Sequence, residues 1–251
     1  MAKIQHLQKP PIREALIDLQ FADADIGSDQ LESVANALLN AGCTKKELFA
    51  TEAEFGPDGE VGGQGLVLRR QISAFDGYAI VNASESVILQ VRSDRVTASH
   101  IGAYDRWEDL VADADRALQA HAAVSRAQRI KRVAARFINH VPVPTGAGDD
   151  LANLLTAPPI HPIEVGPCMR REFASRQVLE HVEGGLTAIL AVATAQTPEG
   201  ERALVIDVDV FKMGESPAIM ERLRPDLDAI RLVKNRLFFG SLTEDALEQC
   251  R

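Results

Sequence analysis

The chain has few cysteines, few aromatic residues and no long apolar run. Its three cysteines, Cys43, Cys168 and Cys250, form neither a CxxC pair nor a zinc-ligand spacing, so we expect reduced thiols, as is usual in the cytosol. No stretch approaches the roughly 18 apolar residues of a membrane-spanning helix. The N-terminus, MAKIQHLQKPP, lacks the apolar segment of a secretory signal. These absences predict a cytoplasmic protein without a membrane partner.

Positive charge is also in short supply. The sequence has 27 Lys and Arg against 36 Asp and Glu, a net charge of -9. Such an excess of negative charge argues against general affinity for phosphate backbones, so nucleic acid is not an expected partner. The hydrophobic content of 46% and the charged content of 25% are those of a soluble globular protein. The partner we expect is therefore a protein or a small molecule.

Familiar catalytic motifs are absent from the sequence. There is no GxSxG and no HExxH, and the glycine-rich stretch 56–65 is not followed by the GK[ST] of a phosphate-binding loop. No Cys or Ser has an evident activating partner. The sequence therefore names no catalytic residue and implies no cofactor. It leans toward a binding function and leaves an enzyme open.

The most strand-like stretch is LVIDVDVF, residues 204–211. Side chains alternate between the two faces of a strand. One face is then wholly apolar, with Leu204, Ile206, Val208 and Val210. The other face carries Asp207 and Asp209 between Val205 and Phe211. This pattern predicts a strand that packs a core on one side and presents two carboxylates on the other.

Hydrophobic periodicity and turn signals give the order of the remaining elements. We expect helices over about 28–42, 104–124, 149–157, 216–237 and 243–247, the fourth opening at Ser216-Pro217. Asp76-Gly77 is expected to be a hairpin turn. The expected strands are 13–21, 48–55, 66–73, 78–83, 86–99, 132–143, 168–183, 186–196 and 204–211.

This order predicts an α+β fold of two similar β-α-β-β-β-α halves. Runs of strands followed by a helix favour mainly antiparallel sheets with helices packed on one face. The halves would be an N-terminal α+β repeat, 1–124, and a C-terminal α+β repeat, 125–251, or the two would form one continuous domain. The repeat rests on element order, because residue identity between the halves is slight.

Six polar residues form a conditional binding site. If the first strands of the two halves pair near the centre of one sheet, one surface would hold Glu14, Asp18, Arg136, His140, Asp207 and Asp209. His140 could then carry a proton near neutral pH, and the two aspartates could ligate a hard cation. The alternative is a set of cross-strand ion pairs that hold the register of the sheet. For the nearby Asn139 we favour a structural hydrogen bond to a loop, and for Tyr104 and Trp107 a hydrophobic contact at a helix start.

Four short motifs occur in a characteristic order: Pro10-Pro-Ile-Arg-Glu-Ala15, Tyr104-x-x-Trp107, Arg136-Phe-Ile-Asn139 and Ile206-Asp-Val-Asp-Val-Phe211. Together they resemble the TIGR04255 family, a sporadically distributed group of uncharacterised bacterial proteins of about this length. The stretch His140-Val141-Pro142 departs from that pattern. The resemblance implies a bacterial cytosolic protein and carries no catalytic residue.

The leading expectation is a binding or interaction protein with a groove between the two halves. One alternative is a metal-assisted hydrolase of a phosphate or nucleotide substrate, using Asp207 and Asp209 with Glu14, Asp18 or His140. Another is a partner component of a mobile defence or toxin–antitoxin locus, suggested by the patchy occurrence of the resembled family. A homodimer through the apolar stripe of residues 220–237 is also open.

Overall fold

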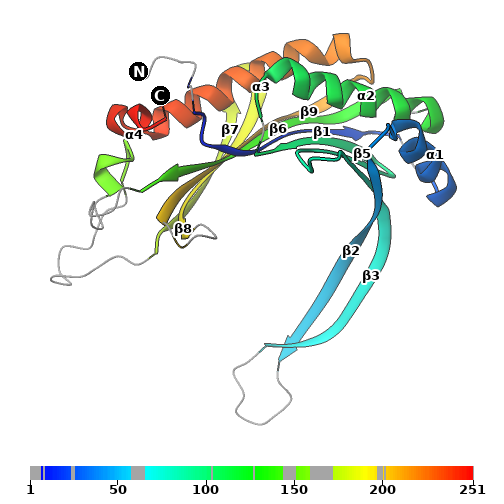
Figure 1. Ribbon diagram of the computed structural model, residues 1–251, viewed down its shortest axis with the longest axis horizontal. Coiled ribbons are helices and arrows are strands. Elements are labelled where there is room, and N and C mark those ends of the chain that lie inside the picture. Colours follow the sequence, from blue (N-terminus) through cyan, green and yellow to red (C-terminus); the bar gives the residue numbers. More distant parts are fainter. Residues whose placement is uncertain are drawn as a thin grey trace.

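A single large antiparallel sheet dominates the structure, a computed structural model (Figure 1). It describes residues 7, 9–23, 26–57, 66–102, 104–126, 128–143, 151–158, 172–196, 200 and 202–250. The strands in chain order are β1 (Ile12–Phe21), β2 (Thr44–Pro57), β3 (Leu66–Val81), β4 (Val87–Arg92), β5 (Arg95–Ile101), β6 (Arg129–Pro142), β7 (Ala174–Val182), β8 (Leu186–Gln196) and β9 (Arg202–Pro217).

Within the described residues these nine strands lie in the order β2-β3-β4-β5-β1-β6-β9-β8-β7. Every pairing between neighbours is antiparallel. β1 is the central strand, and β6, the strand expected to open the C-terminal half, is hydrogen-bonded beside it. β1, β6 and β9 are consecutive neighbours, so the strands that carry the six predicted polar residues lie side by side.

The helices cover one face of the sheet, as the sequence predicts. They are α1 (Ser28–Leu38), α2 (Trp107–Ser125), α3 (Met220–Ser241) and α4 (Glu244–Glu248), and short 3-10 turns occur at Leu151–Asn153 and Glu183–Gly185. Figure 1 shows α2 and α3 side by side above the arched sheet, with the β2–β3 hairpin projecting away below. We call the other side of the sheet the open face. The α+β class and the large antiparallel sheet are confirmed.

The core lies between the helices and the sheet. On β9 the apolar face predicted from LVIDVDVF packs there, since Leu204, Ile206, Val208 and Val210 are all fully buried. On β1 and β6 the odd-numbered residues do the same, with Ile17, Leu19 and Phe137 inaccessible to solvent. The even-numbered residues 14–20 of β1 and 132–140 of β6 and the odd-numbered residues 205–211 of β9 therefore lie on the open face.

The predicted hairpin turn at Asp76-Gly77 is wrong. β3 runs unbroken through both residues and pairs with β2 across a bulge between Leu48 and Phe49. Gly77 has φ +147°, and a Cβ there would lie 2.1 Å from the carbonyl oxygen of Val91. The glycine therefore marks a close approach of two strands, a role that a sequence alone does not separate from a turn.

Two other element boundaries differ from the prediction. The expected strand 86–99 is divided into β4 and β5 by a turn at Ser93 and Asp94, which contains neither Gly nor Pro. Ser216-Pro217 ends β9 and does not open α3, because pairing with β6 continues as far as Pro217. The helix begins at Met220.

None of the helices in the described part of the chain is both long and apolar enough to cross a bilayer. Two of the three cysteines, Cys43 and Cys250, are free thiols. Burial raises the pKa of the Cys250 thiol, so this cysteine stays protonated near neutral pH. Cys168 and the glycine-rich residues 58–65 lie outside the described residues.

Candidate functional site

The six polar residues singled out in the sequence all lie on the open face, on the adjacent strands β1, β6 and β9. Register explains the gathering: Asp18 is opposite Ala134, Arg136 is opposite Asp209, and Asp207 is opposite Ile138. Diagonal neighbours across antiparallel strands are within reach of long side chains. Arginines on β6 can therefore reach carboxylates on both flanking strands.

Arg132 joins two of these carboxylates. Its Nη1 donates to Oδ1 of Asp18 at 2.9 Å, and its Nη2 donates to Oδ2 of Asp209 at 3.3 Å. The guanidinium also lies over the ring of Phe211, 4.5 Å from the centroid. Asp18 accepts a further hydrogen bond from the Thr97 hydroxyl at 3.0 Å. Burial raises the pKa of Asp209, while Arg132 works in the opposite direction.

Arg136 forms the second part of the same arrangement. Its Nε and Nη2 donate to the two carboxylate oxygens of Asp207, a bidentate pair. This hydrogen bond raises the pKa of the guanidinium, which is held as a cation in any case. We call the five side chains of Asp18, Arg132, Asp209, Arg136 and Asp207 the charge ladder. The cross-strand ion pairs considered for this face are present.

Glu14 and His140 share the face and stand outside the charge ladder. Within the described residues neither side chain has a hydrogen bond or an ion pair. Burial and then the nearby charge of Arg13 lower the pKa of His140, which is therefore neutral at pH 7. His140 pairs in register with Val205, beyond the end of the ladder. Four of the six residues thus take part in ion pairs, Asp18 and Asp209 through Arg132, and Arg136 with Asp207, and the other two stand at the margin.

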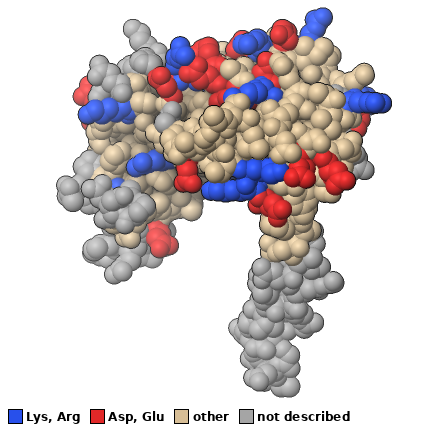
Figure 2. All heavy atoms as spheres, turned by 45° about the vertical axis from the view of Figure 1, so that its right-hand side comes forward, with Lys and Arg blue, Asp and Glu red and all other residues tan. Residues whose placement is uncertain are grey.

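Charges of both signs also mix on the visible surface. In Figure 2 Lys and Arg lie next to Asp and Glu beneath the helices and where the β2–β3 hairpin leaves the body. Ion pairs outside the charge ladder include Arg92 with Asp76, and Arg95 with Asp94. No group of three or more His, Cys, Asp or Glu placed to hold a metal ion occurs among the described side chains.

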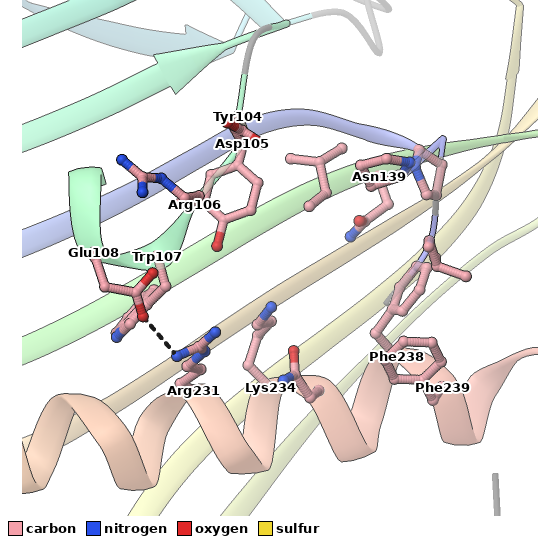
Figure 3. Close-up of a pocket in the computed structure, with 15 residues that line it drawn as sticks. Tyr104, Asp105, Arg106, Trp107, Glu108, Asn139, Arg231, Lys234, Phe238 and Phe239 are labelled. Carbon is pink, nitrogen blue, oxygen red and sulfur yellow. Dashed lines mark hydrogen bonds and ion pairs between the residues drawn. The ribbon is translucent and has the colours of Figure 1, made fainter. Parts of the chain in front are cut away.

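A pocket lies on the opposite, helix-bearing side of the sheet. It has a volume of about 430 Å³, within the range typical of small-molecule sites. It opens between α3, the first turn of α2 and the segment leading into β1 (Figure 3). Its apolar walls come from Leu7, Pro10, Pro11, Ile12, Trp107, Phe238 and Phe239.

Lys234 of α3 is the least usual residue in this pocket. It is only 8% exposed, and within the described residues it forms no hydrogen bond or ion pair. Its Nζ lies over the Phe137 ring, 3.7 Å from the centroid. Every fully enclosed side-chain nitrogen or oxygen of the described residues has a partner, so the Lys234 amine must reach the pocket space. Figure 3 shows it pointing there.

Burial and a neighbouring cation both act on that amine. Desolvation, followed by the charge of Arg231, lowers the pKa of Lys234 to about 7. The π face of Phe137 works against this shift because it stabilises the cation. An ordinary lysine has a pKa near 10.5. Lys234 is therefore poised between its charged and neutral forms at neutral pH.

Arg231 supplies the second positive charge. It lies one helical turn before Lys234 on α3, donates to Oε1 of Glu108 at 3.3 Å and lies over the ring of Trp107 at 5.6 Å. α2 begins at Trp107, and no side chain caps its first turn. The same turn carries Glu108 and Asp109, whose carboxylates offset the positive end of the helix dipole. Arg231 and Lys234 thus bring two cations to a pocket whose lining also includes Arg106 and the carboxylates Asp105 and Glu108.

Tyr104 and Asn139 add two polar groups to the apolar walls. Burial raises the pKa of Tyr104 to about 12, so its hydroxyl remains a donor. Asn139 donates from Nδ2 to the carbonyl of Ile206 at 3.0 Å, a structural bond as expected, but to strand β9 and not to a loop. It also lines the pocket. Tyr104 packs edge-on against Phe137 at 5.3 Å, and Trp107 stacks on the same ring at 6.3 Å.

Sequence reasoning missed this site, although three of its elements were singled out for other reasons. Pro10-Pro11, Tyr104 with Trp107, and Asn139 come from separate parts of the chain and meet here. The signal for Lys234 was available: it lies four residues after Ile230 and seven after Leu227, on the buried stripe of α3. A lysine on an apolar stripe is a candidate for a buried functional charge.

Comparison with known proteins adds no relative: no protein-family model matches the chain, and no curated protein matches it.

Proposed function

We propose that this chain is a binding protein for small organic anions with an apolar portion, taken up in the pocket beside Lys234. One observation carries the proposal: an amine less than one tenth exposed, without a hydrogen-bond or ion-pair partner among the described residues, faces a pocket of about 430 Å³. A buried charge without a partner is costly. An incoming anion would supply the missing partner.

The rest of the pocket supports the same chemistry. Arg231, although paired with Glu108, adds a second cation near Lys234, and Tyr104 offers a hydroxyl donor. The remaining walls are prolines and aromatic rings, which favour a hydrocarbon portion. A carboxylate at one end of an aliphatic or aromatic group satisfies both kinds of surface. A strongly hydrated inorganic anion would satisfy only the first.

The position of the pocket supports a groove between two halves, which we retain as part of the proposal. Its walls come from 7, 10–12 and 104–108 on the N-terminal side of residue 125, and from 139, 231, 234–235 and 238–239 on the C-terminal side. The strand order is also compatible with two repeats that share one sheet. In each half the first strand pairs with the last strand, β1 with β5 and β6 with β9. Membership of the TIGR04255 family and a bacterial cytoplasmic location remain proposals that rest on the sequence.

Calorimetric titration with straight-chain carboxylates from acetate to octanoate, and with benzoate, tests the binding function. We expect at least one of these carboxylates to bind. The matched amide of that carboxylate should bind more weakly. Lys234→Met should weaken that binding by about tenfold to a hundredfold, the equivalent of a hydrogen bond to a charged group. Because the bound anion keeps Lys234 protonated, affinity should fall as pH rises above about 7.

The matched control is Lys46→Met, which removes an exposed lysine paired with Glu85 outside the pocket. It should leave carboxylate affinity unchanged. Binding of amides as tight as that of carboxylates, or no binding by any member of the series, would overturn the proposal. Far-UV circular dichroism of each variant separates a lost site from a lost fold.

The metal-assisted hydrolase has no comparable support. Asp207 and Asp209 are each bonded to an arginine, and the described side chains form no cluster of three metal ligands. A protein partner, a homodimer or a role beside a neighbouring defence component has no specific observation in its favour among the described contacts. The pocket is therefore the site on which the functional proposal rests.

A further inference from the structure

We propose that Lys234 forms an imine with a small ketone or aldehyde that also carries a carboxylate. The inference rests on the proposed binding of organic anions in the same pocket and names the chemistry that follows binding. It requires a neutral amine, a carbonyl that can reach it, and a place for the carboxylate. Each of these three conditions corresponds to a feature of the pocket.

The amine is set up as a nucleophile by its surroundings. Lysines become nucleophilic when they are desolvated in an apolar pocket or placed beside another cation. Lys234 meets both conditions, being 8% exposed and next to Arg231 on α3. No carboxylate among the described residues pairs with it to hold the proton. Its pKa of about 7 leaves a large neutral fraction near neutral pH.

The pocket places a ligand's two ends in different positions. The Arg231 guanidinium is 43% exposed and bonded to Glu108 through Nη1, so it has further donors for a ligand carboxylate. A carbonyl a few bonds away would then face the Lys234 amine. Figure 3 shows the hydroxyl of Tyr104 directed toward the same space as that amine. Because this hydroxyl stays protonated, it can donate to the carbonyl oxygen and polarise the bond.

The reaction balances without an oxidant or a reductant. The Nζ lone pair bonds to the carbonyl carbon, and the carbonyl π electrons move to oxygen, which takes up a proton. The resulting carbinolamine loses its hydroxyl group with a second proton, as water, while the C=N bond forms. The two hydrogens of the amine leave in that water molecule. Once protonated, the imine is a cation, and the Phe137 ring at 3.7 Å is placed to stabilise it.

The test is reductive trapping of the wild-type chain with levulinate, the keto acid of the same length as pentanoate, and sodium borohydride. Borohydride delivers hydride to the imine carbon and makes the bond to Lys234 permanent. Peptide mapping by mass spectrometry then locates the adduct. At about pH 7 we expect at least about tenfold more adduct on Lys234 than on the exposed Lys46, because an ordinary lysine is almost wholly protonated there.

Two further measurements make the result specific. The initial rate of trapping at Lys234 should level off above about pH 7, whereas that at Lys46 should keep rising toward about pH 10. Lys234→Arg keeps the positive charge and removes the nucleophile, so it should abolish the dominant adduct. Lys46→Met should leave the Lys234 adduct unchanged.

Calorimetry with pentanoate distinguishes failure of this inference from failure of the proposed function. Pentanoate binding that depends on Lys234, together with no levulinate adduct, would overturn the imine and leave anion binding standing. Adduct spread evenly over the surface lysines would also overturn it. If neither pentanoate nor levulinate binds and no carboxylate of the series does, both proposals are wrong.

Discussion

The two faces of the central strands hold charged side chains in opposite situations. On the open face, Arg132 and Arg136 of β6 each have carboxylate partners on neighbouring strands. On the helix face, Lys234 lies over Phe137 of the same strand and has no such partner among the described residues. In the ladder, charge is matched within the fold. In the pocket, the charge of Lys234 has no partner among the described residues and is available to a ligand.

This difference shows how the structure distinguishes supporting charges from functional ones. The ladder charges join three adjacent strands and so help to fix their register. The register matters because a slip of one residue would expose the apolar face. Lys234 fixes nothing of that kind, and its burial is a cost to folding. A residue that destabilises the fold while facing a pocket is a candidate for function.

The largest expected effect comes from removing the unmatched charge. Lys234→Met should stabilise the protein by about 4 kcal/mol at pH 7, since the pKa falls from 10.5 to about 7 and one pKa unit corresponds to about 1.4 kcal/mol. The sign follows from the lowered pKa of about 7. The folded state binds this proton less tightly than the unfolded state, so the penalty is full below about pH 7 and disappears as pH rises toward 10.5.

Urea denaturation of Lys234→Met and wild type at several pH values checks this expectation. The stability difference should shrink steadily between pH 7 and pH 10, because wild type regains stability as Lys234 becomes neutral in the unfolded state too. Lys46→Met again serves as the control and should show no such trend. A destabilised Lys234→Met protein would show that Lys234 is a structural residue and would remove the contrast between the faces.

The second expected effect comes from removing a paired charge on the open face. Arg132→Met should destabilise the protein by about 2 kcal/mol, because it leaves Asp18 and Asp209 without their shared cation in a largely buried position. Without Arg132 the pKa of Asp209, already raised by burial, should rise further. Part of the loss should therefore disappear as the pH is lowered and Asp209 is protonated.

Thermal and urea unfolding at pH 7 and near pH 4 measure this loss and its pH dependence. Asp209→Asn in the same background is the matched control, since it removes the buried charge that Arg132 no longer neutralises and should recover part of the stability. A loss that is equal at both pH values would assign the effect to packing of the Arg132 stem over Phe211.

Much of the fold could be predicted because strand periodicity is a local property. LVIDVDVF indicates which residues of β9 face the core, and the same alternation places Asp18, Arg136, Asp207 and Asp209 on the open face. Their contact depends on β1 lying next to β6, which the sequence allowed only as a condition. Turn positions were predicted less well. Gly77 allows two strands to approach closely and makes no turn, whereas the chain turns at Ser93 and Asp94 without a glycine.

The pocket could not be predicted because its parts are far apart in the sequence. Residues 7, 10–12, 104–108, 139, 231, 234–235 and 238–239 contribute to it, and only the packing of α3 beside α2 brings them together. Lys234 carries a local signal, a charge on an apolar stripe. That signal identifies burial and says nothing of whether a carboxylate from another element lies nearby. Whether a buried charge is paired or unpaired is a tertiary property.

The smallest expected effect refines the comparison within the ladder itself. Arg136→Met removes a bidentate pair with Asp207, yet the Arg136 side chain is 44% exposed against 18% for Arg132. Water screens the more exposed pair, so we expect a loss of about 0.5–1 kcal/mol. That loss should diminish at high ionic strength, whereas the loss in Arg132→Met should persist. Urea denaturation with and without added salt measures both. If the two variants lose equal stability, burial does not separate matched charges in this sheet, and geometry of the arginine–carboxylate contact must do so.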